Sequence, residues 1–450
     1  MNHQPRRQAR LNLRNDLSFL PTVQTFIENT ALTFGLGHAE ALALTLAGEE
    51  IFNYLCSSVK PQTEIEISCH EGGYYAALHF SLPIHNFAMR AFNLTATIDL
   101  EDEKSLDEMG LLIASRMVDY LRIGQNESGR LQLLLRKEKS YPQAAANIFP
   151  PGAPISDQFT IISPEAEELK FFINACRRGT AADRLPPEFD YPGKVVDMVN
   201  SGDFRAAIAR DHTGHIGGGI IWFWSSNKMV ECHGPYILAP AADPHPAMAP
   251  ALRQALSEAL LEHCLNAIAK SPAVGLLNRA PGPDLPRHHF ESLGTVSEYR
   301  SGAPALEIPA LLRQMQEDPG AVAWAHPDLE PFLRRHYQRL TLPREIRLTS
   351  ESGEATTAFS VLATDFDRPR QKVTLRPLWA GTDMAKNIAD HLAIFAEEEL
   401  NNIFFVLDLG QSWQAAFFPA LTQNGFTPRL LLPYGGTGDL LVLQKTGVPA

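Results

Sequence analysis

Cysteine and long apolar runs are scarce in this sequence. Its 450 residues include five cysteines, Cys56, Cys69, Cys176, Cys232 and Cys264, and none of them forms a Cys-x-x-Cys pair. A sparse, odd-numbered set is typical of free thiols in a reducing compartment and argues against a disulfide framework. A structural zinc site of the common type is therefore not expected. No apolar run is long enough to cross a bilayer, so we expect no membrane span.

Basic residues are also fewer than acidic residues. The chain has 39 Lys and Arg against 51 Asp and Glu, a formal net charge of -12. Nucleic-acid binding needs clustered Lys and Arg, so we expect no nucleic-acid partner for the chain as a whole. The first ten residues are basic but lead into polar sequence, and we predict no secretory signal. The hydrophobic share of 45% and charged share of 20% indicate a globular protein. The cysteine pattern and the lack of a predicted signal lead us to expect a cytoplasmic one.

A stretch rich in Pro, Ala and Gly divides the chain. Residues 141–155 contain YPQAAANIFPPGAP, which disfavours regular structure and predicts a linker after a domain at 11–140. The remainder repeats one order of elements: helix, hairpin strands, strand, long helix, strand, short helix, strand. We expect two domains there, at 156–302 and 303–447, each with helices on both faces of a mixed sheet.

A carboxylate and a carboxamide lie one turn apart in the second helix predicted for the N-terminal block. Glu49 and Asn53 are four positions apart and project from one helical face. Leu42 and Leu46 share that side, so the face should be half buried. An amide oxygen can ligate Mg²⁺, and a carboxylate can activate a hydroxyl or a water. The Glu-x-x-x-Asn spacing is also common in helices that have no such role.

The element order of residues 11–139 adds context to this pair. It consists of two helices, a Gly-Gly hairpin, a helix entered through Gly110 and Leu111, and a final strand. This order resembles the anti-sigma-factor serine kinase branch of the GHKL ATPases, which have the Bergerat fold, a mixed sheet faced by helices. The resemblance implies ATP and Mg²⁺ as cofactors, with Glu49 as general base and Asn53 as the metal ligand. It also implies close approach of the Gly110 backbone to the phosphates.

That resemblance further implies a regulatory protein. Its partner would be a protein such as a sigma factor or an anti-sigma antagonist, and homodimerisation is possible. One motif departs from the family pattern, because Phe80 to Ile84 lack the Asp and the glycines of the Asp-x-Gly-x-Gly sequence that reads adenine. Loss of that buried Asp should strongly reduce base selectivity. Three hypotheses follow for this block: a protein serine/threonine kinase, a nucleotide-binding regulator without phosphoryl transfer, or a degenerate scaffold that binds a protein partner.

The two C-terminal copies resemble GNAT N-acetyltransferases in tandem. The resemblance rests on element order and on the segments FESLG (290–294) and FPALTQNGF (418–426), taken as ends of short helices. The family holds the acetyl-CoA pyrophosphate with a glycine-rich turn before the long helix. The first copy has prolines there, which remove backbone donors. Gly381 and Thr382 in the second copy are the better acetyl-CoA candidates, so N-acyl transfer by that copy is a further alternative.

The overall expectation is an α/β (α+β) protein, with a Bergerat-type α/β sandwich followed by two acetyltransferase-like mixed-sheet domains. Two minor motifs complete the list of candidates. Gly435 to Gly438 lack the P-loop lysine and indicate a hairpin turn. His288 and His289, beside Arg287, indicate either a basic surface or part of a site.

Overall fold

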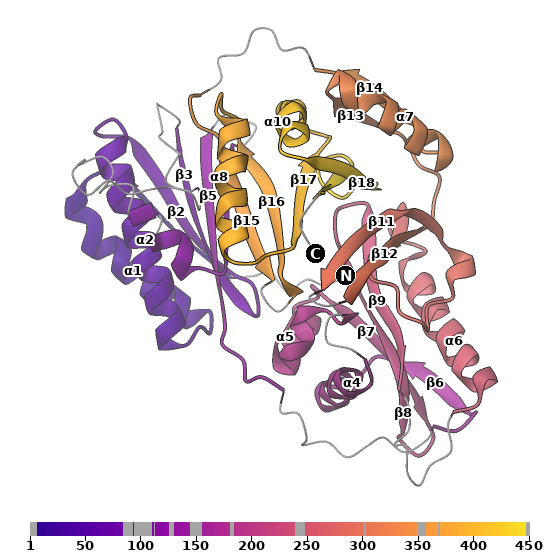
Figure 1. The fold of residues 1–450 in the computed structure, drawn as a ribbon. Helices are drawn as coiled ribbons and strands as arrows, with labels where there is room; N and C mark the ends of the chain where they lie inside the picture. Colours follow the sequence, from indigo (N-terminus) through magenta and orange to yellow (C-terminus); the bar gives the residue numbers. More distant parts are fainter. Residues whose placement is uncertain are drawn as a thin grey trace. The chain divides into compact units, whose positions relative to one another are not determined.

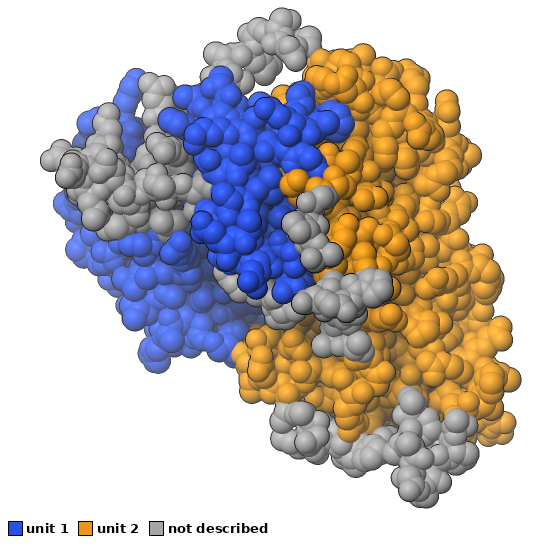
Figure 2. Space-filling model, viewed as in Figure 1, with its two compact units in different colours: residues 1–140, 351–406, 417–425 blue, residues 141–350, 407–416, 426–450 orange. Residues whose placement is uncertain are grey.

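The chain forms a mixed α/β protein with two compact units (Figures 1 and 2). Unit 1 comprises residues 1–140, 351–406 and 417–425, and unit 2 comprises 141–350, 407–416 and 426–450. The computed structural model describes residues 7–83, 93, 110–111, 113–125, 130–144, 155–180, 184–238, 248–300, 303–349, 357–367 and 370–446. The predicted third domain, 303–447, is thus divided between the two units.

A five-stranded sheet and two helices form the N-terminal part of unit 1. The strands are β1 (Gln8–Arg14), β2 (Glu64–Glu71), β3 (Tyr75–Pro83), β4 (Tyr120–Gln125) and β5 (Arg130–Glu138). Their order is β1-β2-β3-β5-β4 and every pairing is antiparallel, whereas the family resemblance implies a mixed sheet. The hairpins β2–β3 and β4–β5 account for two of the antiparallel pairs.

Helices α1 (Leu20–Thr33) and α2 (His38–Ser58) lie side by side next to this sheet (Figure 1). Alternate residues of β2 and β5, such as Ile65 and Ile67 of β2, are buried in one cluster with the apolar residues of both helices. This period of two is what a sheet with one covered face requires. The sequence also favours a helix from Asp107 to Leu121, the one entered through Gly110, but Tyr120 already starts β4, a strand absent from the predicted order.

Two further strands share this hydrophobic core. β15 (Val361–Asp367) and β16 (Lys372–Trp379) form an antiparallel pair, and Val361 is fully buried in the same cluster as α1 and α2. Unit 1 also holds α8 (Met384–Glu397) and α10 (Phe418–Gln423). β17 (Asn402–Asp408) pairs in parallel with β16 through Asn402 to Phe405. The N-terminal block is therefore packed as one body with part of the second copy.

Unit 2 contains the first copy almost as its element order predicts. Its helices are α4 (Ala166–Gly179), α5 (Pro192–Asn200) and α6 (Pro250–Ile268). Its strands are β6 (Phe159–Ile162), β7 (Arg205–Asp211), β8 (Ile216–Trp224), β9 (Met229–Ile237), β10 (Gly275–Asn278), β11 (Glu291–Arg300) and β12 (Ala303–Gln314). They lie in the order β6-β7-β8-β9-β10-β12-β11 within a mixed sheet of twelve strands. Of these neighbours only β9 and β10 pair in parallel.

One expectation for this copy is wrong. Residues 290–294 do not end a helix, because β11 starts at Glu291 and Pro281, Pro283 and Pro286 before it disfavour helix. A short 3-10 turn, η5 (Arg287–His289), stands there instead. The boundary at residue 302 falls in the β11–β12 hairpin, and β12 pairs with both β10 and β11. The N-cap of α4 is Glu165, and its N–H donates to Glu168 Oε2 in a capping box.

The remaining elements of unit 2 flank a small parallel pair. β13 (Ala321–Ala325) and β14 (Arg344–Leu348) pair in parallel and are joined through α7 (Glu330–Arg339). β18 (Phe426–Leu432) and β19 (Leu440–Lys445) form an antiparallel hairpin, which confirms the turn predicted at Gly435 to Gly438. The five cysteines are all free. No helix among the described residues is long and apolar enough to span a membrane.

Candidate functional site

The predicted carboxylate–amide pair lies on a half-buried face of α2. Glu49 and Asn53 are both partly exposed there, as the sequence predicts. Glu49 faces α1, because Gln24 Nε2 donates a hydrogen bond of 2.8 Å to its Oε2. The carboxylate assigned as general base therefore already has a partner within the two-helix layer. Whether Asn53 holds Mg²⁺ stays a prediction.

The residue that lies against Gly110 is Glu50, which the sequence analysis missed. A Cβ at Gly110 would lie 2.4 Å from Glu50 Oε2, so the glycine admits close approach of that carboxylate. Burial, and secondly the charge of Glu49, raises the pKa of Glu50. A carboxylate in this position repels a phosphate when it is ionised. The next residue, Leu111, is fully buried in the hydrophobic core, which accounts for its apolar type without a cofactor.

The positions expected to read adenine contribute to the core of unit 1. Phe80 is fully buried and Leu82 is 1% exposed, and both belong to the cluster formed with α1 and α2. Ile84, the last residue of this segment, lies outside the described residues. The described part of this motif thus consists of core side chains.

In the first copy, the ladder between the parallel strands β9 and β10 is short. It joins Met229–Glu231 to Gly275–Leu277 and ends there, whereas β9 continues to Ile237. Asn278, which is 1% exposed, lies where the ladder ends and donates from Nδ2 to the Gly234 carbonyl at 3.1 Å. The exposed Arg279 donates from Nε to both carboxylate oxygens of buried Glu231, at 2.8 and 2.9 Å. Side chains of β10 and the residue after it therefore bind β9 directly at this point.

Asp284 links the end of β9 to the first turn of α6. Its Oδ2 accepts a hydrogen bond from the Ile237 N–H at 3.1 Å, and its Oδ1 accepts one from Arg253 Nε at 2.6 Å. The side chain of Asp284 is only 8% exposed. In the family that the sequence resembles, this junction is where backbone donors meet a pyrophosphate. Here an internal carboxylate holds one backbone donor and one cation of the junction.

The junction before α8 in the second copy is also filled by the chain itself. A Cβ at Gly381 would lie 2.2 Å from the backbone nitrogen of Ser360, so this glycine admits close approach of the protein backbone. The N–H of Thr382 donates to the Thr357 carbonyl at 2.9 Å. The carboxylate of Asp383 accepts from the Ser360 N–H at 2.6 Å. The segment Thr357–Ser360 thus contacts Gly381 and Thr382, the two residues before α8 that the sequence predicts to bind acetyl-CoA.

A buried amide network holds the segment Thr357–Ser360 in place. Asn93 donates to the Ser360 carbonyl at 2.7 Å and accepts from the Leu362 N–H at 2.9 Å. Asn387 of α8 donates to Ser360 as well. His391, fully buried one turn further along α8, donates from Nδ1 to the Asn387 carbonyl at 2.9 Å. Among the residues that the structure describes, its Nε2 has no hydrogen-bond partner.

The buried His391 and the half-buried His79 predict the pH dependence of unit 1. Burial lowers the pKa of His391, and burial, with His70 and Arg136 nearby, lowers the pKa of His79 to about 4. Below about pH 6.5 the unfolded chain binds protons that the folded chain excludes. Stability is therefore complete above that pH and is lost as the pH falls toward about 4. Urea unfolding at pH 7.5 and 5 should show this slope.

Variants identify the source of that slope. His79→Gln and His391→Leu should each reduce the loss of stability between the two pH values, whereas the exposed His212→Gln should not. An unchanged slope in both buried-site variants would contradict this assignment.

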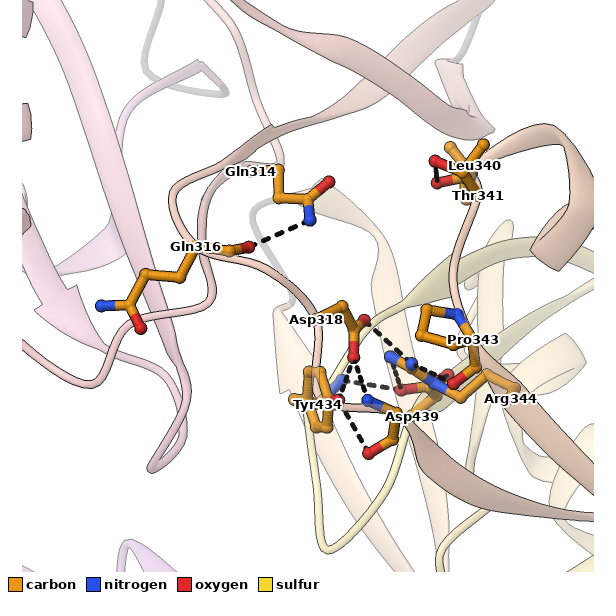
Figure 3. Close-up of polar contacts among 10 residues, drawn as sticks. Gln314, Gln316, Asp318, Leu340, Thr341, Pro343, Arg344, Tyr434 and Asp439 are labelled. Carbon is orange, nitrogen blue, oxygen red and sulfur yellow. Dashed lines mark hydrogen bonds and ion pairs between the residues drawn. The ribbon is translucent and has the colours of Figure 1, made fainter.

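A densely connected buried polar cluster surrounds Arg344 of β14 (Figure 3). Its guanidinium pairs with Asp318 and Asp439, each at 2.8 Å, and the exposed fractions of the three side chains are 0%, 2% and 1%. Tyr434 donates its hydroxyl to Asp318, and its ring lies 4.5 Å from the guanidinium. Each charged group has a partner inside the cluster. The cluster therefore connects β14 to the β18–β19 turn, and its role is structural.

Comparisons with known proteins give similarity for about a third of the chain. No family model matches, and no curated protein matches. A spermidine N-acetyltransferase from Vibrio cholerae, solved with CoA and spermine, is 12% identical over 36% of this chain and 97% of that chain, with a TM-score of 0.26. A GNAT phosphinothricin acetyltransferase from Sinorhizobium meliloti, solved with AcCoA, is 15% identical over 36% and 90%, also at 0.26.

An aminoglycoside 6'-acetyltransferase type Ii is likewise 13% identical over 36% of this chain and 99% of that chain, with a TM-score of 0.26. Each of these acetyltransferase structures is thus similar to about a third of this chain. Nothing in these comparisons supports the resemblance of residues 11–139 to a GHKL domain.

Proposed function

We propose that the chain is a non-catalytic interaction protein, in which acetyltransferase-like domains and an N-terminal α/β block bind a partner protein. The observation that carries the proposal is that both junctions before the long helices are occupied by groups of the chain itself. Asp284 occupies the first junction and Thr357–Ser360 the second. Ile237, Arg253 and Thr382 thus already donate hydrogen bonds to other groups of the chain.

Charge opposes a pyrophosphate at the first junction. The diphosphate of CoA would have to lie beside the carboxylate of Asp284, which is 8% exposed and poorly screened by water. To bind it, Arg253 and the Ile237 N–H would have to leave Asp284, and the buried carboxylate would lose both partners. An unpaired buried charge of this kind costs roughly 3–5 kcal/mol. Arg253 therefore pairs with Asp284 rather than with a ligand.

Backbone packing opposes a ligand at the second junction. The contact between Gly381 and Ser360 leaves no room for a phosphate, since it does not admit even a methyl group. Displacing Thr357–Ser360 would also break the bonds from Asn93 and Asn387 to Ser360. N-acyl transfer by the second copy is consequently disfavoured.

The N-terminal block supports the same conclusion for a nucleotide. Glu50, rather than a phosphate, fits against Gly110, and Gln24 holds Glu49. A kinase would need Glu49 turned toward a metal-bound triphosphate and the Gly110 backbone free to approach the phosphates. Partner binding without nucleotide chemistry requires neither change.

Thermal unfolding tests the proposal. A ligand at 100 times its Kd stabilises the folded state by about 2.7 kcal/mol. Acetyl-CoA at millimolar concentration should leave the melting temperature unchanged, and Mg²⁺ with ATP should do the same. Asp284→Ala serves as the matched variant, because it removes the carboxylate and frees Arg253. A rise in the melting temperature of the wild-type protein with either ligand would contradict the proposal.

Affinity capture of protein partners tests whether the chain forms the complex that the proposal predicts. The proposal predicts a complex whose yield is the same with and without ATP, Mg²⁺ and acetyl-CoA. A complex that forms only with ATP would favour the nucleotide-dependent regulator instead.

A further inference from the structure

Two histidines and one glutamate meet on the surface of the first copy. Glu258 lies in the middle of α6, and His288 and His289 lie in η5, the turn before β11. One ligand atom from each residue lies within 4.8 Å of the others. His289 Nε2 is 3.2 Å from Glu258 Oε2, and His288 Nε2 is 3.7 Å from Glu258 Oε1.

The spacing fits a small transition-metal ion. Zn²⁺ binds imidazole nitrogen and carboxylate oxygen at about 2.0–2.2 Å in tetrahedral geometry, so neighbouring ligands stand about 3.3 Å apart. Both nitrogen–oxygen distances lie near that value before any rearrangement. Two imidazoles and one carboxylate also suit zinc better than Mg²⁺ or Ca²⁺, which prefer oxygen ligands alone. The partly buried Glu258 stands on a helix of 19 residues, which fixes its backbone.

One neighbour opposes the ion. Arg313 of β12 donates from Nη1 to His289 Nδ1 at 2.9 Å. This contact makes Nδ1 an acceptor, so the neutral ring carries its proton on Nε2 and donates it to Glu258. A metal on Nε2 moves that proton to Nδ1, where it faces the guanidinium. Arg313 therefore lowers the affinity of the site and must turn away when the metal binds.

We infer that Glu258, His288 and His289 form a binding site for a divalent transition metal of the zinc class, with further positions open to water. The bound ion would tie η5 to α6. The same loop carries Asp284 four residues before His288, so the ion would also hold the segment that closes the first junction. The inference rests on the cluster alone and does not depend on the proposed function.

Calorimetric titration of the full chain with Zn²⁺ in a non-chelating buffer tests the site. The wild-type protein should bind one ion at the site, and Zn²⁺ should raise the melting temperature. Glu258→Gln and His288→Gln should each weaken binding roughly tenfold or more, as expected when a ligand or its orientation is lost. Arg313→Met should tighten binding, because it removes the cation that faces His289.

His215→Gln is the matched control. His215 is an exposed histidine beside Asp211 on another edge of unit 2, with a side chain that is 45% exposed, and its loss should leave the affinity unchanged. Binding that survives Glu258→Gln and His288→Gln would mean an adventitious ion only and would overturn the inference. Absence of Zn²⁺ binding by the wild-type protein, or weaker binding by Arg313→Met, would overturn it as well.

Discussion

Replacing Arg344 with methionine is expected to lower the free energy of unfolding of unit 2 by about 3–5 kcal/mol. The guanidinium is fully buried and carries the positive charge that pairs with Asp318 and Asp439, which are nearly fully buried themselves. Methionine is unbranched and uncharged, so both carboxylates would remain in the interior without that partner. Tyr434, whose ring stacks near the guanidinium, would lose its contact too (Figure 3).

Arg347→Met on the same strand is the matched control. Arg347 pairs with Glu345, and the side chains are 48% and 63% exposed, so water replaces the lost partner. Urea unfolding should show a large loss of stability for Arg344→Met and almost none for Arg347→Met. Equal effects of the two substitutions would show that the buried cluster does not stabilise unit 2.

Asp408→Asn is expected to destabilise the end of β17 by about 2–4 kcal/mol, because each buried donor left unpaired costs roughly 1–3 kcal/mol. The carboxylate accepts from the N–H groups of Gly410, Thr437 and Gly438 and from the Thr437 hydroxyl, at 2.8–3.0 Å. Asparagine preserves the volume but turns an N–H₂ group toward some of these donors.

A second acidic residue of unit 2 provides the comparison for Asp408. Asp190 pairs with Arg177 and its side chain is 46% exposed, so Asp190→Asn should cost less than about 1 kcal/mol. Chemical denaturation of the two variants measures the difference. If Asp190→Asn were the more damaging change, the turn Gly435–Gly438 would not depend on Asp408.

Local patterns predicted most of the elements of this chain. The alternating apolar residues of β2, β3 and β5 and the long apolar helices α2, α6 and α8 are evident in the sequence, because each element has its own period. β4 was missed because Tyr120 and Leu121 continue an apolar helical pattern, and only the pairing with β5 makes them a strand. The prediction of a short helix ending at 290–294 is wrong for a similar reason. These residues form part of β11 by pairing with β12, which lies further along the chain.

The candidate sites depended on which group approaches each glycine. The sequence predicts close approach of a phosphate at Gly110 and of acetyl-CoA at Gly381, and in the structure a Cβ at either glycine would clash with another part of the protein. It cannot tell a phosphate from another part of the protein: Glu50 approaches the first glycine and the backbone of Ser360 the second. Asp284 carries no local signal of its role, because Ile237 and Arg253 meet it only after folding.

Isothermal titration of the full chain with acetyl-CoA tests the central claim most directly. If Asp284 and the segment Thr357–Ser360 close the two junctions, no saturable heat should appear up to millimolar acetyl-CoA. Saturable binding at a Kd of about 10 μM or below, a favourable binding free energy of roughly 7 kcal/mol or more, would contradict the account. Such binding would require one junction to open at little cost in free energy.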